Sequence, residues 1–204
     1  MKMYFFYGVM NSSKTAMALM KDFSFTEHGK KVVLLKPSLD KRDGEVILRS
    51  RIGLLKKAVV INTFESIKET VKGIESYDVI IVDEAQFLKA EQVNELRELA
   101  DNSPMVMCYG LKTDYMGNLF EGSKRLIEVS DCIRELPAPC LCGKKAVMNA
   151  KYIGNKIIYQ GDQVDLGGNE KYIGLCHACW KSGTIKREIE EIKARVFMNF
   201  EAVN

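Results

Sequence analysis

An apolar run of five residues, Met3–Tyr7, leads directly into a loop that carries a lysine and a threonine at the start of a helical pattern. The residues of this loop are Gly8, Val9, Met10, Asn11, Ser12, Ser13, Lys14 and Thr15. Their spacing matches G-x-x-x-x-G-K-[ST], with a serine at the position of the second glycine. A turn between a strand and a helix directs backbone N–H groups at one point, where the helix N-terminus also favours an anion. The pattern predicts a phosphate-binding loop (P-loop) for ATP, with Lys14 on the β- and γ-phosphates and the Thr15 hydroxyl on Mg²⁺.

Ser13 is the departure from this pattern. Glycine adopts positive φ freely, so a serine at this position requires a different local conformation or carries strain. Taken without its neighbours, the segment also fits an ordinary turn, rich in serine and asparagine, that caps a helix. The position of the loop directly after the first strand favours phosphate binding, while Ser13 leaves the affinity for ATP open.

A second apolar run, Val79–Val82, ends in the segment DEAQF at residues 83–87. An acid at the end of such a strand is the second half of a P-loop site, so Asp83 is predicted to hold Mg²⁺ through water. Because strand side chains alternate, we expect Glu84 to point away from the metal and to take a proton from an attacking hydroxyl or water. We group Gln86 with the ATP and magnesium residues. The alternative is a solvated acidic loop, which the presence of a P-loop in the same chain disfavours.

Strands and helices alternate over the first two-thirds of the chain. Further apolar runs predict strands at Val32–Leu35, Val59–Ile61 and Met105–Tyr109. Apolar periodicity predicts helices at Lys14–Phe23, Phe64–Gly73 and Ala90–Ala100. The first of these helices has an apolar stripe of Ala16, Leu19, Met20 and Phe23. The alternation predicts an α/β fold whose mostly parallel sheet is covered on both faces.

The composition changes at the Leu-Pro-Ala-Pro segment, residues 136–139, where the alternation stops and cysteines begin. We therefore expect a P-loop domain at residues 1–136, a smaller cysteine-bearing domain at 137–183 and a helical tail at 184–204. The helical spacing of the tail rests on Ile185, Ile189, Ile192 and Val196.

Charge and hydropathy restrict the function further. The net charge is only +3, from 30 basic and 27 acidic residues among 204, which disfavours a nucleic-acid groove or a membrane surface. No apolar run approaches the roughly 20 residues that span a bilayer. We expect a soluble, cytoplasmic protein.

Four of the six cysteines form two close pairs, Cys140 with Cys142 and Cys176 with Cys179. In a reducing compartment such pairs are typical of a metal site, and four thiolates make a closed, tetrahedral zinc site. We expect structural Zn²⁺, with four free thiols as the alternative and His177 as a bystander. Gly143 would allow the tight turn after the first pair. Cys108 and Cys132 are predicted to be buried apolar residues.

The insertion between the cysteine pairs contains a glycine-rich stretch, residues 161–172. Its glycines allow close approach of the backbone to a ligand, so a loop tied at its base by metal suggests a lid. A plain hairpin in a zinc ribbon is the alternative.

The order of these motifs resembles the cellular type of thymidine kinase, the zinc-containing family with a lasso loop. The resemblance covers Tyr4–Trp180 and rests on the P-loop, on DEAQF, on YGLKTD at 109–114, on both cysteine pairs and on GGNEKY at 167–172. It implies a P-loop, RecA-like parallel core with a small C-terminal zinc-ribbon and lasso domain. It also implies a homotetramer that takes thymidine and ATP, gives dTMP in nucleotide salvage and is inhibited by dTTP.

The resemblance further implies residue roles. Glu84 would deprotonate the sugar 5′-hydroxyl, and Asp40 and Arg42 would lie near the phosphates. The base pocket would be lined by Met10, Phe87, Leu111, Tyr115 and Phe120. The lasso would hold the thymine edge through Gln163, Val164, Asp165, Leu166 and Gly167, with Tyr172 on the sugar or the lasso. Tyr115 replaces a phenylalanine, which adds a hydroxyl. Deoxyuridine is expected as a weaker substrate, because one methyl group is worth only about 1–3 kcal/mol.

Two other functions compete with this one. A P-loop ATPase acting on nucleic acid would fit the DEAQ segment, but one chain of 204 residues lacks a second motor lobe. A zinc-ribbon binding module with a decayed P-loop would show no ATP turnover and a salt-sensitive affinity for DNA.

Overall fold

The computed structural model describes residues 2–40, 46–163 and 171–185. Its centre is a sheet of six strands in the order β5-β2-β6-β7-β1-β8, all paired in parallel. The bounds are β1 Met3–Tyr7, β2 Val32–Pro37, β5 Val59–Ile61, β6 Val79–Val82, β7 Met105–Gly110 and β8 Cys132–Glu135. The prediction of a parallel α/β core is confirmed. Strand β8 lies at the edge of the sheet and was missed, because its sequence, Cys-Ile-Arg-Glu, is neither a continuous apolar run nor an alternation of apolar and polar residues.

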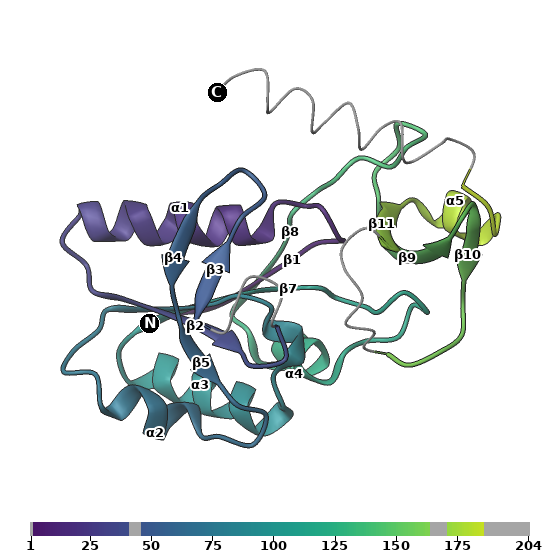
Figure 1. Cartoon of the computed structure of the whole chain (residues 1–204). Coiled ribbons are helices and arrows are strands. Elements are labelled where there is room, and N and C mark those ends of the chain that lie inside the picture. Colours follow the sequence, from purple (N-terminus) through teal and green to yellow (C-terminus); the bar gives the residue numbers. More distant parts are fainter. Residues whose placement is uncertain (1, 41–45, 164–170, 186–204) are drawn as a thin grey trace.

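Helices cover both faces of this sheet (Figure 1). Helix α1, Lys14–Glu27, packs on one face through Ala18 and Leu19. The other face is covered by three helices, α2 Ile67–Lys72, α3 Ala90–Asn102 and α4 Glu121–Val129. The carboxyl ends of β1, β6 and β7 therefore meet at one edge of the sheet, which is where ligands bind in open α/β sheets.

Two details of the predicted helices were wrong. Met20 and Phe23 do not face the core, since 54% and 63% of their surfaces are exposed, and the buried face of α1 instead includes Ala18 and Asp22. Helix α2 begins three residues later than predicted. Ser66 caps it by accepting a hydrogen bond from the Glu69 N–H, and Phe64 is 93% exposed.

The charged stretch after β2 contains a short hairpin that the sequence did not indicate. Strands β3 Ile47–Arg49 and β4 Leu55–Lys57 pair antiparallel across the side of α1. Lys56 fixes the hairpin to the helix, because its Nζ lies 2.6 Å from a carboxylate oxygen of buried Asp22. A second contact joins the hairpin to β2, because the Nζ of Lys36 donates to the carbonyl of Ile47 at 3.1 Å.

A second, smaller sheet follows the parallel core. Its order is β10-β9-β11, with β9 Met148–Ile153, β10 Lys156–Ile158 and β11 Tyr172–Leu175, and helix α5 His177–Lys181 follows. Thr184 bridges to Lys156, and Ile185 is buried in the core of this sheet. The domain boundaries stay predictions, and Ile189, Ile192 and Val196 lie outside the described residues. No helix in the described part of the chain is long and apolar enough to cross a membrane.

Candidate active site

The P-loop follows β1 and turns into α1 with two residues in the left-handed region. Asn11 has φ 68° and Ser13 has φ 60°, the conformation that glycine adopts without cost. Ser13 thus takes the glycine conformation with a serine side chain, which is the strained case expected from the sequence. The Ser13 side chain makes no capping hydrogen bond to α1. The first N–H groups of the helix are therefore not capped by that hydroxyl and face the position expected for phosphate.

Lys14 lies inside this loop rather than in solvent. Its Nζ donates to the carbonyl of Val9 at 2.8 Å, and to the carbonyl of Gly8 and the hydroxyl of Ser12 at 3.4 Å. A side chain at Gly8 would lie only 2.2 Å from Ser12 Oγ, so the turn requires glycine there. The ammonium group is held at the centre of the loop, where a phosphate would compete for it.

Asp83 directly follows strand β6 and is buried beside the P-loop. Burial first, and then the charge of Glu84, raise the pKa of Asp83 to about 7. A hydrogen bond from the Thr15 hydroxyl acts in the opposite direction and favours the charged carboxylate. Among the described residues, the buried Oδ1 of Asp83 has no hydrogen-bond partner. A carboxylate oxygen left without a partner beside a threonine hydroxyl fits a hard cation, so these two residues suit Mg²⁺.

Glu84 is buried too, but alternation along a strand does not orient it. Strand β6 ends at Val82, and Glu84 adopts a left-handed conformation, φ 51° and ψ 35°, before a single 3₁₀ turn at Ala85–Phe87. This turn, rather than the pleat of a strand, sets the direction of the carboxylate. The three described non-glycine residues with positive φ, Asn11, Ser13 and Glu84, all belong to this one site.

Gln86 connects Glu84 to the end of strand β7. Its Nε2 donates to Glu84 Oε2 at 2.5 Å, and its Oε1 accepts the backbone N–H of Leu111 at 2.9 Å. A side chain at Gly110 would lie 2.8 Å from Gln86 Oε1, so the absence of one lets the glutamine approach the strand. Both polar groups of the Gln86 amide are used within the site, and its predicted role with ATP and magnesium stays a prediction.

Asp40 lies just past the carboxyl end of β2. Its Oδ2 is 3.5 Å from the Nζ of Lys36, which is fully buried and also donates to the carbonyl of Ile47. The buried lysine holds Asp40 at the edge of the sheet. Arg42, its predicted companion near the phosphates, lies outside the described residues.

The loop between β7 and α4, residues 111–120, carries most of the predicted base pocket. Leu111, Tyr115 and Phe120 are buried in it. The ring of Phe120 packs edge to face on that of the half-buried Phe87, with 5.9 Å between the ring centroids. Asp114 shapes the loop by accepting the N–H groups of Met116 and Asn118, each at 2.9 Å. The structure thus places three of the five residues that the resemblance assigned to the pocket in this loop, with Phe87 in contact with one of them, and the pocket itself stays a prediction.

Tyr115 joins this loop to residues 137–183, the predicted small domain. Its hydroxyl donates to the carbonyl of Asp162 at 3.0 Å, and its own carbonyl accepts the indole N–H of Trp180 at 3.1 Å. The centroid of its ring also lies 6.2 Å from the ring centroid of Tyr172. Gln163 adds a second tie, because its Nε2 donates to Asp114 Oδ2 at 3.0 Å. The hydroxyl that distinguishes Tyr115 from phenylalanine therefore anchors the start of the predicted lasso, whose residues Val164, Asp165, Leu166 and Gly167 lie outside the described residues.

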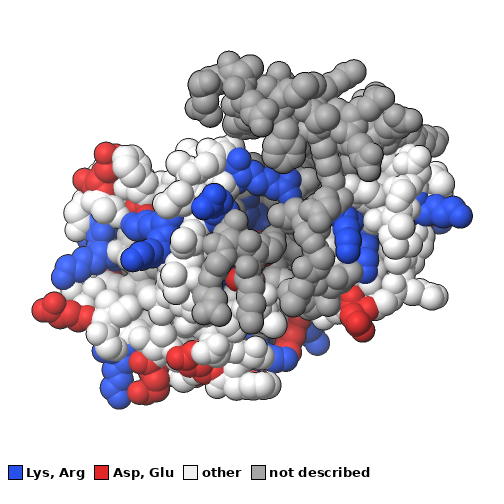
Figure 2. All heavy atoms as spheres, in the orientation of Figure 1, with Lys and Arg blue, Asp and Glu red and all other residues white. Residues whose placement is uncertain are grey.

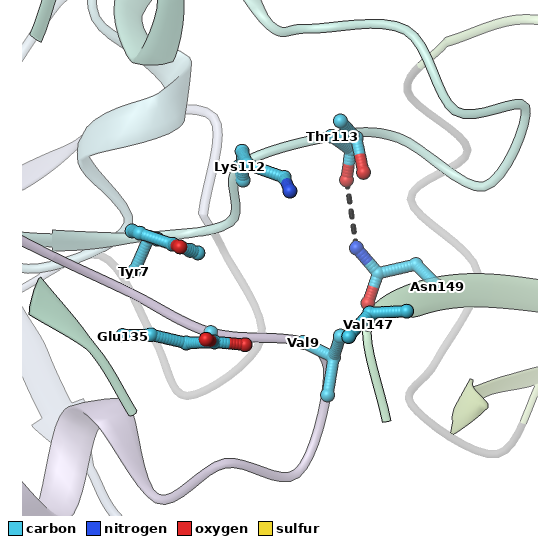
Figure 3. A pocket seen from close by; sticks show the side chains of 8 residues that line it. Tyr7, Val9, Lys112, Thr113, Glu135, Val147 and Asn149 are labelled. Carbon is cyan, nitrogen blue, oxygen red and sulfur yellow. Dashed lines mark hydrogen bonds between the residues drawn. The ribbon is translucent and has the colours of Figure 1, made fainter. Parts of the chain in front are cut away.

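Met10, the fifth pocket residue, is held by a residue that the sequence did not single out. Asn149 Oδ1 accepts the Met10 N–H at 2.8 Å, and Asn149 Nδ2 donates to the Thr113 carbonyl at 2.7 Å. Figure 3 shows Asn149 hydrogen-bonded to Thr113 at one side of a small pocket that Tyr7, Val9 and Lys112 also line. An asparagine within a strand of another sheet carries no motif, so no sequence signal pointed to it.

The four predicted metal ligands form one cluster. The Sγ atoms of Cys140, Cys142, Cys176 and Cys179 all lie within 4.8 Å of one another. Cys142 Sγ is 3.6 Å from that of Cys140 and 3.7 Å from that of Cys176. A tetrahedral site with Zn–S bonds of about 2.3 Å has edges of about 3.8 Å, so the cluster fits zinc.

The surroundings of the cluster agree with the other cysteine predictions. Gly143 has φ 86° and makes the tight turn after the first pair, and His177 is exposed and stands outside the cluster. The backbone N–H of Lys144, first among several hydrogen bonds, lowers the pKa of Cys142 to about 7. Of the two remaining cysteines Cys108 is buried as predicted, whereas Cys132 is only half-buried because it lies on the edge strand β8.

The arrangement combines a phosphate loop and a buried pair of carboxylates at one edge of a sheet with apolar side chains in the loop that follows β7. These are the parts that phosphoryl transfer requires, since it depends on positioning and charge neutralisation rather than on covalent catalysis.

The comparisons with known proteins agree with this chemistry. A model of the thymidine kinase family matches residues 1–180. The thymidine kinase of Rhodopirellula baltica is 36% identical over 94% of this chain and 93% of its own length. The thymidine kinase of Enterobacteria phage T4 is 42% identical over 89% of this chain and 96% of its own length. The thymidine kinase of Zymomonas mobilis is 40% identical over 86% of this chain and 93% of its own length. Among solved structures, that of the Legionella pneumophila ATPase DotB covers 71% of this chain and 43% of its own chain, with a TM-score of 0.38 and 15% sequence identity. This similarity is too low to bear on function. By its motifs and its relatives, the chain belongs to the thymidine kinase family.

Proposed function

We propose that the protein transfers the γ-phosphate of ATP to the 5′-hydroxyl of thymidine, giving dTMP and ADP for nucleotide salvage. The observation that carries this proposal is the buried Glu84 carboxylate, which lies next to Asp83 at the P-loop and is fixed by Gln86. A P-loop and an acid alone would serve any nucleotide hydrolase. Glu84 is a second buried carboxylate, which a left-handed turn directs and which Gln86 connects to the loop after β7. This arrangement supports the view that Glu84 acts on the hydroxyl of an acceptor.

In the proposed mechanism, the P-loop N–H groups and Lys14 bind the phosphates and balance charge on the γ-phosphoryl group. Thr15 and Asp83 would hold Mg²⁺, which neutralises charge on the β- and γ-phosphates when bound. Glu84 accepts the proton of the 5′-hydroxyl while the 5′-oxygen of the nucleoside forms a bond to the γ-phosphorus. The bond between that phosphorus and the oxygen that leaves with ADP breaks. Asp40 and Arg42 would act on the phosphate side of the site.

The base would enter the apolar pocket formed by Leu111, Phe87, Phe120, Tyr115 and Met10. Residues 163–167 would close over its polar edge with backbone groups, and Tyr172 would contact the sugar or the lasso. Backbone donors and acceptors discriminate strongly, because a wrong base leaves them unpaired, whereas the 5-methyl group is worth only about 1–3 kcal/mol. Thymidine is therefore the preferred substrate and deoxyuridine a weaker one.

The remaining properties are proposals of the same kind. dTTP, which carries both a thymine and a triphosphate, fits the two halves of the site as a feedback inhibitor. The homotetramer, the cytoplasmic location and the absence of a nucleic-acid partner follow from the family resemblance and the modest charge. Figure 2 shows a band of lysine and arginine across the middle of one face, with acidic residues mostly along its lower edge.

The test is to incubate the purified protein with ATP, Mg²⁺ and a panel of nucleosides, and to identify the products. We expect dTMP from thymidine, less dUMP from deoxyuridine and no product from purine nucleosides. Turnover of ATP that needs single-stranded DNA and yields no nucleotide monophosphate would instead support an ATPase acting on nucleic acid, and would overturn the proposal.

A further inference from the structure

Asn149 is a buried residue of the small domain that reaches two loops of the P-loop domain. It lies on the central strand β9, with 3% of its surface exposed. Its amide oxygen accepts the N–H of Met10 in the P-loop, and its amide nitrogen donates to the carbonyl of Thr113 in the β7–α4 loop. One side chain thus connects three segments that are far apart in the sequence. Figure 3 shows its contact with Thr113.

The P-loop has two further contacts with the same domain. Val9 is 7% exposed and packs in the core of the small domain, which includes Ala146 and Leu175. Gly174 of β11 approaches so closely that a side chain there would lie 2.6 Å from Val9 Cγ2 and 3.1 Å from the Met10 carbonyl. The P-loop therefore packs directly against the small sheet.

The P-loop depends on such support because of its conformation. Asn11 and Ser13 are both left-handed, and residues in such conformations persist only where the surrounding structure fixes them. Asn149 holds Met10, the residue directly before Asn11. An asparagine suits this position because its amide offers one acceptor and one donor, as the two loops require.

We propose that Asn149 is a positioning residue for the phosphate site, through which the cysteine-bearing domain holds the P-loop in its nucleotide-binding conformation. This domain then acts on ATP as well as on the nucleoside. The inference rests on the proposed function only in taking the P-loop ligand to be ATP. It assigns Asn149 no contact with the reacting atoms.

The experiment compares the full chain with Asn149→Ala, and uses Asn155→Ala as a control. Asn155 lies on an exposed turn of the same small domain, before β10. Affinity for a non-hydrolysable ATP analogue with Mg²⁺ is measured by calorimetry without thymidine, and amide exchange of residues 8–15 is followed by mass spectrometry.

In Asn149→Ala we expect the dissociation constant of the ATP analogue to rise about tenfold, the effect of one buried hydrogen bond lost with its partner left unpaired. Exchange of the P-loop amides should accelerate, while Asn155→Ala matches the parent in both measurements. A folded Asn149→Ala protein with parental zinc content and nucleotide affinity within twofold of the parent overturns the proposal. So does a loss confined to thymidine binding, or a fall in kcat with unchanged nucleotide affinity.

Gly174→Ala provides a second variant in case Asn149→Ala does not fold. The added Cβ would press on Val9 and the Met10 carbonyl, so nucleotide affinity should again fall, and an unchanged affinity would count against the proposal. Because nucleotide binding is measured without thymidine, this result is separate from the test of function. A parent that binds the analogue yet fails to phosphorylate thymidine contradicts the proposed function alone.

Discussion

The side-chain amide of Gln86 lies between Glu84 and the end of strand β7, with its Nε2 2.5 Å from Glu84 Oε2. Its oxygen accepts the backbone N–H of Leu111, so the glutamine cannot rotate without breaking a second bond. The proposed general base is thereby fixed relative to the loop that carries the predicted base pocket. Misplacement of a catalytic group by about 1 Å can cost a hundredfold in rate.

Replacing Gln86 should therefore affect the chemical step more than binding. We expect Gln86→Met to lower kcat at least tenfold and to leave KM for ATP and thymidine within about twofold. Gln92→Met is the matched control, since Gln92 is another buried glutamine whose amide bonds only to backbone groups outside the site. It should lower the melting temperature and keep kcat. Equal effects of both variants on kcat would show that Gln86 has no special role.

Removing the charge of Glu84 tests its role directly. Glu84→Gln should keep the affinity for the ATP analogue and lower kcat by about 10²- to 10⁴-fold, the usual contribution of a general base. Steady-state kinetics and calorimetry on the same preparation measure the two quantities. Glu121→Gln, at the exposed start of α4, serves as the control with parental kcat. Full activity of Glu84→Gln would exclude Glu84 as the base.

The pKa of Asp83 makes stability depend on pH. Burial and the charge of Glu84 raise it from 3.8 to about 7, so the folded state keeps a proton that the unfolded chain has lost. Without Mg²⁺ and nucleotide, the free energy of unfolding should fall as pH rises from about 4 to about 7, by up to about 4 kcal/mol, because each pKa unit is worth about 1.4 kcal/mol.

Asp83→Asn removes this dependence, because an amide stays neutral. Denaturant unfolding at pH 5 and pH 8 should show the variant more stable than the parent at pH 8, with a smaller difference at pH 5. Mg²⁺ with nucleotide should reduce the loss in the parent by pairing the carboxylate. If parent and variant respond to pH alike, Asp83 is not the group that titrates.

Tyr115 predicts a selective effect on the nucleoside. Tyr115→Phe removes the hydrogen bond to the Asp162 carbonyl and should raise KM for thymidine about three- to tenfold, the usual range for one hydrogen bond, with KM for ATP unchanged. Tyr77→Phe, at the amino end of β6, lies at the other end of the sheet and should match the parent. If Tyr115→Phe raised KM for thymidine and KM for ATP equally, the hypothesis that the Tyr115 hydroxyl anchors only the lasso would be contradicted.

The cysteine cluster predicts one zinc ion per chain, measured by elemental analysis of fresh protein. Cys176→Ser should lose the metal and destabilise the small domain, because structural zinc contributes directly to folding. Cys132→Ser is the control, since Cys132 is half-buried on the edge strand and outside the cluster. Parental protein that contains no zinc would refute the metal site.

Sequence by itself determined most of the strands and helices of the parallel core, the P-loop, the acidic strand end and the paired cysteines. These features are encoded locally, either in the period of apolar residues or in the spacing of a few residues within one turn. That is why the strands β1, β5 and β6 were predicted to the residue, and why the four cysteines were placed in one cluster.

Only the tertiary structure decided how these parts are held. Glu84 is directed by a left-handed turn and by Gln86, which bonds a residue 25 positions away, and Met10 is held by Asn149 from 139 positions away. The same holds for α1, whose buried face depends on the sheet beneath it, so Met20 and Phe23 are exposed despite their apolar stripe. The physical reason is that hydrogen bonds and packing between distant segments leave no period or spacing in the sequence, since each partner is an ordinary residue in its own element.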